Sequence, residues 1–220
     1  MATKAIPIVA IDLETDPVAT GLVEKLARPG RNLTGLFLDL PEIAGKWLEF
    51  LRETVPQLSR VGVVGTARIN QAQFAAIEAV APASKYVLRR LNIADGRFLQ
   101  AAFDAAVQER LHGIVVLPSP LVLDNRARIA ALAMERKLPT VFLFTQAVEA
   151  GGLIAYGPDV NEMSRRAARL LIRVLNGAQP GELPIERPTH FHLVVNVKTA
   201  QVLGLSMPPT LLARADKVIE

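Results

Sequence analysis

Short apolar runs rich in β-branched residues alternate with longer segments of helical periodicity along most of this 220-residue chain. The run at 113–117 shows no alternation of apolar and polar residues, which is typical of a strand buried on both faces. Further strand-like runs lie at 60–64, 86–91 and 140–144, and helical segments lie at 70–80, 96–110 and 123–136. Because expected strands and helices alternate along the chain, the sequence predicts a parallel sheet with helices on both faces.

The rest of the chain predicts more elements of the same two kinds, separated by proline and glycine turns. Before residue 56, the expected elements are strands at 6–11 and 33–38 and helices at 17–27 and 41–55. After Gly151 and Gly152, the expected elements are strands at 153–156 and 191–195 and helical segments at 161–176, 199–203 and 211–215. The predicted fold class is α/β.

The composition excludes several functional classes. Without cysteine, the chain has no disulfide, thiol nucleophile or thiolate metal site. Its 25 basic and 21 acidic residues are spread along the chain and aromatics make up 5 %, so we expect no nucleic-acid partner. No glycine-rich phosphate loop follows an expected strand, and no run reaches the ~20 apolar residues that span a bilayer. The sequence therefore predicts no cofactor.

Two groups of chemistry-bearing side chains remain. His190 and His192 share a face of an expected strand, but no third ligand accompanies them, so we expect no metal site. Asp12, Glu14 and Asp16 alternate after the first strand, and paired carboxylates can perform acid–base chemistry. No histidine or lysine partner for them is visible in the sequence, so an enzyme stays a minor alternative and no catalytic residue is assigned.

The ends of the expected strands carry the candidate binding residues, because ligands of open parallel sheets bind at the carboxyl ends of the strands. These residues are Asp16, Thr66, Pro118, Ser119, Phe144, Tyr156 and Asp159. Ordinary loop chemistry is the alternative, with Asp16 and Asp159 as helix N-caps and the two aromatic residues in the core. For the two aspartates, both roles are compatible.

An ordered series of motifs resembles one bacterial family over essentially the whole chain. The motifs lie at 16–18, 21–23, 26–35, 45–48, 55–61, 138–139, 149–153, 156–158, 166–177, 196–200 and 208–216. They include Asp16-Pro17-Val18, Tyr156-Gly157-Pro158 and Asn196-Val197-Lys198-Thr199-Ala200. The chain resembles the ABC-transporter substrate-binding family related to the tryptophan-binding lipoproteins.

The resemblance implies a type I periplasmic-binding fold, in which two Rossmann-like lobes with parallel sheets close on a small ligand between them. On that model 56–155 form lobe two, and 1–55 with 156–220 form lobe one. Family members carry further lobe-one strands and helices before the strand at 6–11, so the resemblance implies a lobe one truncated at its N-terminus. Exposed strand edges at 6–11 and 33–38 then predict a homo-oligomer formed through lobe one.

The resemblance also implies a function, namely the solute-binding component of an ABC importer with a permease as its partner. For an amino-acid-like or aromatic ligand, Asp16 and Asp159 would accept the ammonium and backbone N–H groups near Thr66 or Ser119 would bind the carboxylate. Phe144 and Tyr156 would stack on an apolar side chain. Such a protein is periplasmic or lipid-anchored. The alternative is a cytoplasmic small-molecule sensor of the same fold, since no signal peptide precedes the first strand.

Overall fold

The computed structural model describes residue 3, residues 5–84 and residues 86–220, and the chain divides into two compact units. Unit 1 comprises Met1–Leu40 and Pro158–Phe191. Unit 2 comprises Pro41–Gly157 and His192–Glu220.

Unit 2 is built on a sheet with the strand order β4-β3-β5-β6-β7-β8-β9 within the described residues. The strands are β3 (Arg60–Gly65), β4 (Val87–Asn92), β5 (Gly113–Val116), β6 (Thr140–Phe142), β7 (Ile154–Pro158), β8 (Phe191–Asn196) and β9 (Lys217–Ile219). From β4 to β7 each neighbouring pair is parallel. The predicted α/β class with parallel strands is confirmed.

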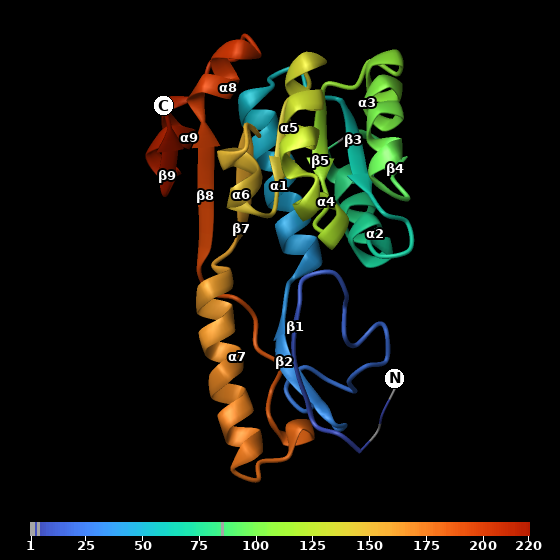
Figure 1. Cartoon of the computed structure of the whole chain (residues 1–220), viewed down its shortest axis with the longest axis vertical. Coiled ribbons are helices and arrows are strands. Elements are labelled where there is room, and N and C mark those ends of the chain that lie inside the picture. The colour runs from blue at the N-terminus through green and yellow to red at the C-terminus, as the bar shows by residue number, and fades with distance from the viewer. Residues whose placement is uncertain (1–2, 4, 85) are drawn as a thin grey trace. The chain divides into compact units, whose positions relative to one another are not determined.

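Helices connect these strands, as the sequence predicted. They are α1 (Leu40–Thr54), α2 (Gln71–Val80), η1 (Ala81–Ser84), η2 (Gly96–Phe98), α3 (Leu99–Gln108), α4 (Pro120–Asp124), α5 (Arg126–Glu135), α6 (Thr145–Glu149), α8 (Val197–Val202) and α9 (Pro209–Arg214). The chain steps from β3 to β4 in one direction and from β4 back to β5 in the other. Right-handed crossovers therefore place α2 and α3 on opposite faces of the sheet (Figure 1).

The central strand β5 is buried on both faces, which confirms the reading of its uninterrupted apolar run. Ile114, Val115 and Val116 are all 0 % exposed. Ile114 and Val116 pack in one cluster with Phe103 of α3 and Ile129 of α5. This rigid centre holds the loops that leave the carboxyl ends of the strands.

Unit 1 contains β1 (Ile8–Asp12), β2 (Leu33–Phe37), α7 (Val160–Leu175) and η3 (Pro180–Glu182). β1 and β2 are parallel, with Ile8 opposite Leu33 and Asp12 opposite Phe37. Gly35 makes their close approach possible, because its φ is +147° and a Cβ there would overlap the carbonyl oxygen of Ala10. α7 lies along these strands, with Met163 packed on Leu36 (Figure 1).

Three details differ from the sequence-based expectations. The predicted helix at 17–27 is wrong, because the segment forms turns that Gly21 interrupts with a left-handed φ of +66°. The predicted helix at 123–136 is two helices, α4 and α5, which meet at Asn125. The short strand β9 follows the last helix and was not predicted.

The units also divide the chain differently from the expected lobes, which placed boundaries after residues 55 and 155. α1 joins unit 2, where the indole Nε1 of Trp47 donates to the carbonyl oxygen of Tyr156 at 2.9 Å. Residues 192–220 join unit 2 as well, because β8 and β9 extend its sheet.

Candidate functional site

Thr66 follows β3 directly, and the buried amide of Asn70 fixes the loop that begins there. The Oδ1 of Asn70 accepts from the Thr66 N–H at 2.7 Å, and its Nδ2 donates to the carbonyl oxygen of Pro118 at 2.7 Å and to Gln73. Asn70 is 0 % exposed. One desolvated side chain therefore ties the end of β3 to the end of β5.

The hydroxyl of Thr66 is the polar group of this loop that has no hydrogen bond within the described structure. Its Oγ1 is buried and has no hydrogen-bond partner among the described residues. A buried polar atom without a partner costs free energy, and native structures contain few of them. The backbone N–H of the neighbouring Ala67 already has a hydrogen-bond partner, because it donates to Oδ1 of Asn92 at 2.7 Å.

Pro118 and Ser119 follow β5 and begin the short helix α4. Ser119 is 2 % exposed, and its Oγ accepts from the Val122 N–H at 3.2 Å as an N-cap. Pro118 and Phe144 line one small apolar pocket of about 10 Å³ with Val122. That volume holds about one water, so this edge offers an apolar surface rather than a cavity.

Tyr156, in β7, brings an aromatic ring to the same unit. Its ring packs edge-on against Phe50 of α1, with centroids 5.0 Å apart and an interplanar angle of 61°. Burial raises the pKa of the Tyr156 phenol above its ordinary value, so the phenol is protonated at neutral pH. Gly157 packs directly on the carbonyl of Leu143, which places the end of β7 beside the segment leading to Phe144.

The two aspartates expected to meet an ammonium lie in unit 1, and both cap turns. The Oδ1 of Asp159 accepts from the N–H groups of Asn161 and Glu162, at 2.8 and 3.0 Å, at the start of α7. The Oδ1 of Asp16 accepts from the N–H groups of Val18 and Ala19 at 2.9 and 3.0 Å. The N-cap interpretation is confirmed for Asp159, and Asp16 caps a turn in place of the predicted helix.

The other acidic and histidine positions have structural partners as well. The Oδ1 of Asp12 accepts from the N–H groups of Glu14 and Thr15, and its Oδ2 accepts from the Thr15 hydroxyl at 2.7 Å. Burial, and secondarily the charge of Asp12, raises the pKa of the half-buried Glu14 carboxyl. His190 pairs through Nδ1 with a carboxylate oxygen of Glu162 at 2.7 Å.

A larger hollow of about 750 Å³ lies at the opposite end of the unit 1 strands. Its lining residues include Pro7 before β1 and Asn32 before β2, together with Lys25, Arg28 and Glu182. Ligands of parallel sheets bind at the carboxyl ends of the strands, so this hollow is not assigned as the site.

In the described part of the chain no three acidic or histidine side chains gather as metal ligands, and no helix has the length and apolarity to span a membrane.

In unit 2 the structure therefore gathers Thr66, Pro118 and Ser119 at neighbouring strand ends, with Phe144 beside Pro118. Asp16 and Asp159 belong to unit 1. Sequence reasoning missed Asn70 and Asn92, which arrange the loop after β3. The available signal was an asparagine four residues after Thr66, at the start of a helical segment, where a side-chain amide can bond to the preceding loop.

The comparisons identify the class of protein. The family model of ABC transporter substrate binding proteins matches residues 1–219. The chain belongs to this family, whose members are non-enzymatic substrate-binding proteins. The predicted resemblance and the expectation that the chain is not an enzyme are thereby confirmed. Solved structures similar to it are periplasmic binding proteins of the type I class, which confirms the predicted fold.

The chain is similar to one curated relative and to two solved structures. The chain is 26% identical over 208 residues to the tyrosine-binding protein of Clostridioides difficile (strain R20291), covering 93% of this chain and 59% of the relative. It is similar to the ABC domain from Streptococcus pneumonia in complex with L-Trp (24% identity, TM-score 0.88, 99% of this chain and 75% of that one). A conserved domain protein of Vibrio cholerae shows 28% identity and a TM-score of 0.88 over 99% of this chain and 73% of that one.

We expect Asn70→Ala to destabilise unit 2 strongly. The substitution leaves the Thr66 N–H and the Pro118 carbonyl without their partner, and each buried unsatisfied group costs about 1–3 kcal/mol. Urea denaturation should show the loss, with the exposed neighbour Gln71→Ala as the matched control. Equal stability of the two variants would contradict the role given to Asn70.

Replacement of Glu14 should have a pH-dependent effect on stability. Because its pKa is raised in the folded chain, the folded state holds this proton more tightly than the unfolded state, and stability falls as pH rises through the raised pKa. Glu14→Gln should therefore raise the melting temperature at neutral pH and not below the ordinary pKa of 4.5. Thermal unfolding across pH checks this, with exposed Glu182→Gln as control. If Glu14→Gln raised the melting temperature by the same amount at all pH values, the role given to the raised pKa of Glu14 would be contradicted.

Proposed function

We propose that this chain is the solute-binding component of an ABC importer and that it binds a small amino acid with an aromatic side chain. Membership of the substrate-binding family supports the general class. The names of a tyrosine-binding relative and of a neighbour bound to L-Trp support the ligand class. The chain spans about 59% of the curated relative's length, so the ligand and partners are proposals for this chain.

The observation that carries the proposal is the buried, unpartnered hydroxyl of Thr66. A ligand carboxylate would accept a hydrogen bond from this hydroxyl, and hydrogen bonds to charged groups are stronger than those between neutral groups. The Thr66 and Ala67 amides already donate to asparagine side chains, so the proposal places the carboxylate at the hydroxyl rather than at these two N–H groups. Ser119 stays a proposed binding residue beside the ligand carboxylate.

The remaining ligand contacts follow from the chemistry of an aromatic amino acid. In unit 2, Phe144 and Tyr156 are the proposed aromatic contacts. Phe144 lines an apolar pocket with Pro118, and the ring of Tyr156 packs on Phe50. In unit 1, Asp16 and Asp159 are the proposed acceptors for the ammonium, in addition to their capping bonds. Aromatic rings prefer edge-on or offset contacts with other rings, and the edge-on packing of Tyr156 on Phe50 is an example within the chain.

The localisation of the protein and a permease as its partner are further parts of the proposal, and they follow from the family. An importer's solute-binding protein acts outside the cytoplasmic membrane, as a periplasmic or lipid-anchored protein, and passes its ligand to a permease. A +4 formal charge and the spread of basic residues along the chain give no reason to expect a nucleic-acid partner.

Calorimetric titration with L-tryptophan and L-tyrosine tests the proposal. We expect saturable binding by the unmodified chain and a loss of about 10- to 100-fold in affinity for Thr66→Val, because a hydrogen bond to a charged group contributes about 1.5–3 kcal/mol. Thr210→Val, at an exposed position of α9, is the matched control and should bind like the unmodified chain. Binding that is unaffected by Thr66→Val, or no binding of either amino acid, would contradict the proposal.

A further inference from the structure

One cationic residue lies beside the apolar surface at the carboxyl ends of β5 and β6 in unit 2. Arg126 begins α5 and lines the same small pocket as Pro118 and Phe144. Every other residue of that lining is apolar and belongs to β5, β6, α4, α6 or the segment between β6 and α6. Arg126 is therefore the charged residue that a ligand would meet at this part of the sheet edge.

The last turn of α4 holds the guanidinium of Arg126 at the pocket. Its Nη1 donates to the carbonyl oxygen of Leu123 at 2.8 Å, and Leu123 lines the pocket as well. Among the residues that the structure describes, no carboxylate pairs with this guanidinium. Because the residue is exposed, its charge is accessible from the solvent side of the pocket.

The surface beneath Arg126 is part of the core of unit 2. Val116, Val122 and Phe142 belong to its main cluster and are 0 %, 3 % and 1 % exposed. The pocket holds about 10 Å³, so an aromatic ring would lie on this surface and not enter it. One face of the ring would then contact the apolar lining, and the other face would point outward.

The proposed position of the ligand carboxylate fits this placement of a ring. Thr66 follows β3 and Phe144 follows β6, and the sheet order at this point is β3-β5-β6. Neighbouring strands lie about 4.8 Å apart, so the ends of β3 and β6 are about 10 Å apart. An amino acid bound through its carboxylate at Thr66 would extend its side chain past the end of β5 toward Phe144 and Arg126.

We propose that Arg126 is a specificity-determining residue, which selects an aromatic ligand by placing its guanidinium over the outer face of the ligand ring. The inference rests on the proposed function and names a further residue of that same site. The face of an aromatic ring carries partial negative charge and attracts a cation. A planar, weakly hydrated guanidinium stacks on such a face better than an ammonium group does.

Unit 2 contains this type of contact at two other places. The guanidinium of Arg90 lies over the ring of Phe74 at 4.9 Å, and that of Arg214 lies over the ring of Phe50 at 5.2 Å. Both of these arginines also pair with glutamates. Arg126 has the same chemistry without a carboxylate partner in the described chain, so its charge is not neutralised before a ligand binds.

An ion pair between Arg126 and the ligand carboxylate is the alternative role. The lining of the pocket disfavours it, because a carboxylate that is desolvated against apolar side chains loses hydration. An aromatic ring gains free energy from the same burial. The two roles differ in how binding depends on the electron density of the ring.

Calorimetric titration with L-tryptophan and ring-fluorinated tryptophans tests the inference. Fluorine withdraws electron density from the ring face, which weakens its attraction for a cation and leaves the ring apolar. The affinity of the unmodified chain should therefore fall stepwise as ring fluorines are added. Arg126→Gln should bind L-tryptophan about 3- to 20-fold more weakly, and its affinity should not fall with fluorination.

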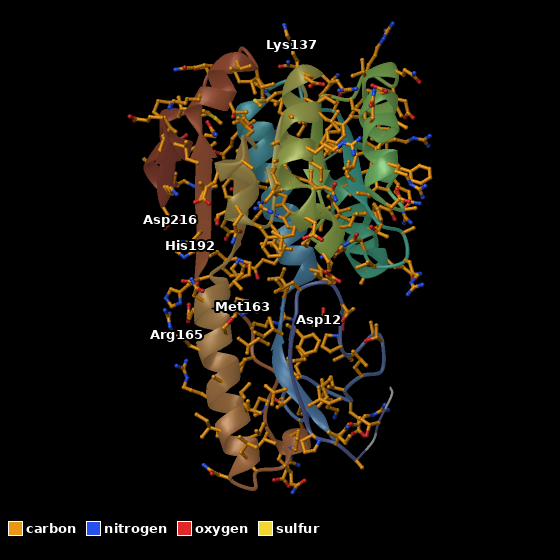
Figure 2. The ribbon with its side chains drawn as sticks, viewed as in Figure 1. Asp12, Lys137, Met163, Arg165, His192 and Asp216 are labelled. Carbon is orange, nitrogen blue, oxygen red and sulfur yellow. The ribbon has the colours of Figure 1, made fainter. Side chains whose placement is uncertain are left out.

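Two charge-removing variants are matched controls. Arg128→Gln changes an exposed arginine of α5 outside the described lining of the pocket. Lys137→Gln removes a positive charge beyond the end of α5 that is distant from α4, where Figure 2 shows Lys137. Both variants should bind L-tryptophan and its fluorinated forms like the unmodified chain. Circular dichroism checks that each variant is folded.

The possible failures are distinguishable. A loss of affinity in Arg126→Gln that is equal for every fluorinated ligand would assign Arg126 to the ligand carboxylate and overturn the ring contact. Unchanged affinity in Arg126→Gln would also overturn it, while binding of L-tryptophan by the unmodified chain would leave the proposed function standing. No binding of L-tryptophan by the unmodified chain would contradict the proposed function and, with it, this inference.

Discussion

The buried amide of Asn70 is the interaction on which the candidate site most depends. It binds the backbone at the end of β3 and the backbone at the end of β5 with one desolvated side chain. Because unpaired polar groups in the interior are costly, this amide fixes both loops in one arrangement. The same arrangement leaves the Thr66 hydroxyl buried without a partner among the described residues, which is why the proposed ligand carboxylate is placed there.

The two units use their apolar residues in different ways. Unit 2 surrounds β5 with helices on both faces, and its central strands reach nearly complete burial. Unit 1 buries β2 fully but leaves β1 partly exposed, and α7 shows apolar side chains on two faces. A two-stranded sheet is marginal by itself. In unit 1, residues of α7 pack on the strands in one cluster, and Val23, Leu26 and Ile185 pack on them in another.

The alternating pattern of the sequence predicted the parallel strands of unit 2 well, because an uninterrupted apolar run such as 113–117 has few alternatives to a buried strand. It failed at 17–27, where apolar spacing indicated a helix but Gly21 adopts a left-handed conformation that ends the turn. Thr66 was predicted from its position after a strand, whereas Asn70 was not, since its role depends on a contact 48 residues away with Pro118.

The most direct test of the ligand site is hydrogen exchange of the backbone amides, measured by mass spectrometry with and without L-tryptophan. The account predicts that the ligand slows exchange in the loops after β3, β5 and β6, which contain Thr66, Ser119 and Phe144, and leaves β9, at the far edge of the sheet, unchanged. Protection confined to other segments, or no protection at a saturating concentration, would contradict the assignment of the site to these strand ends.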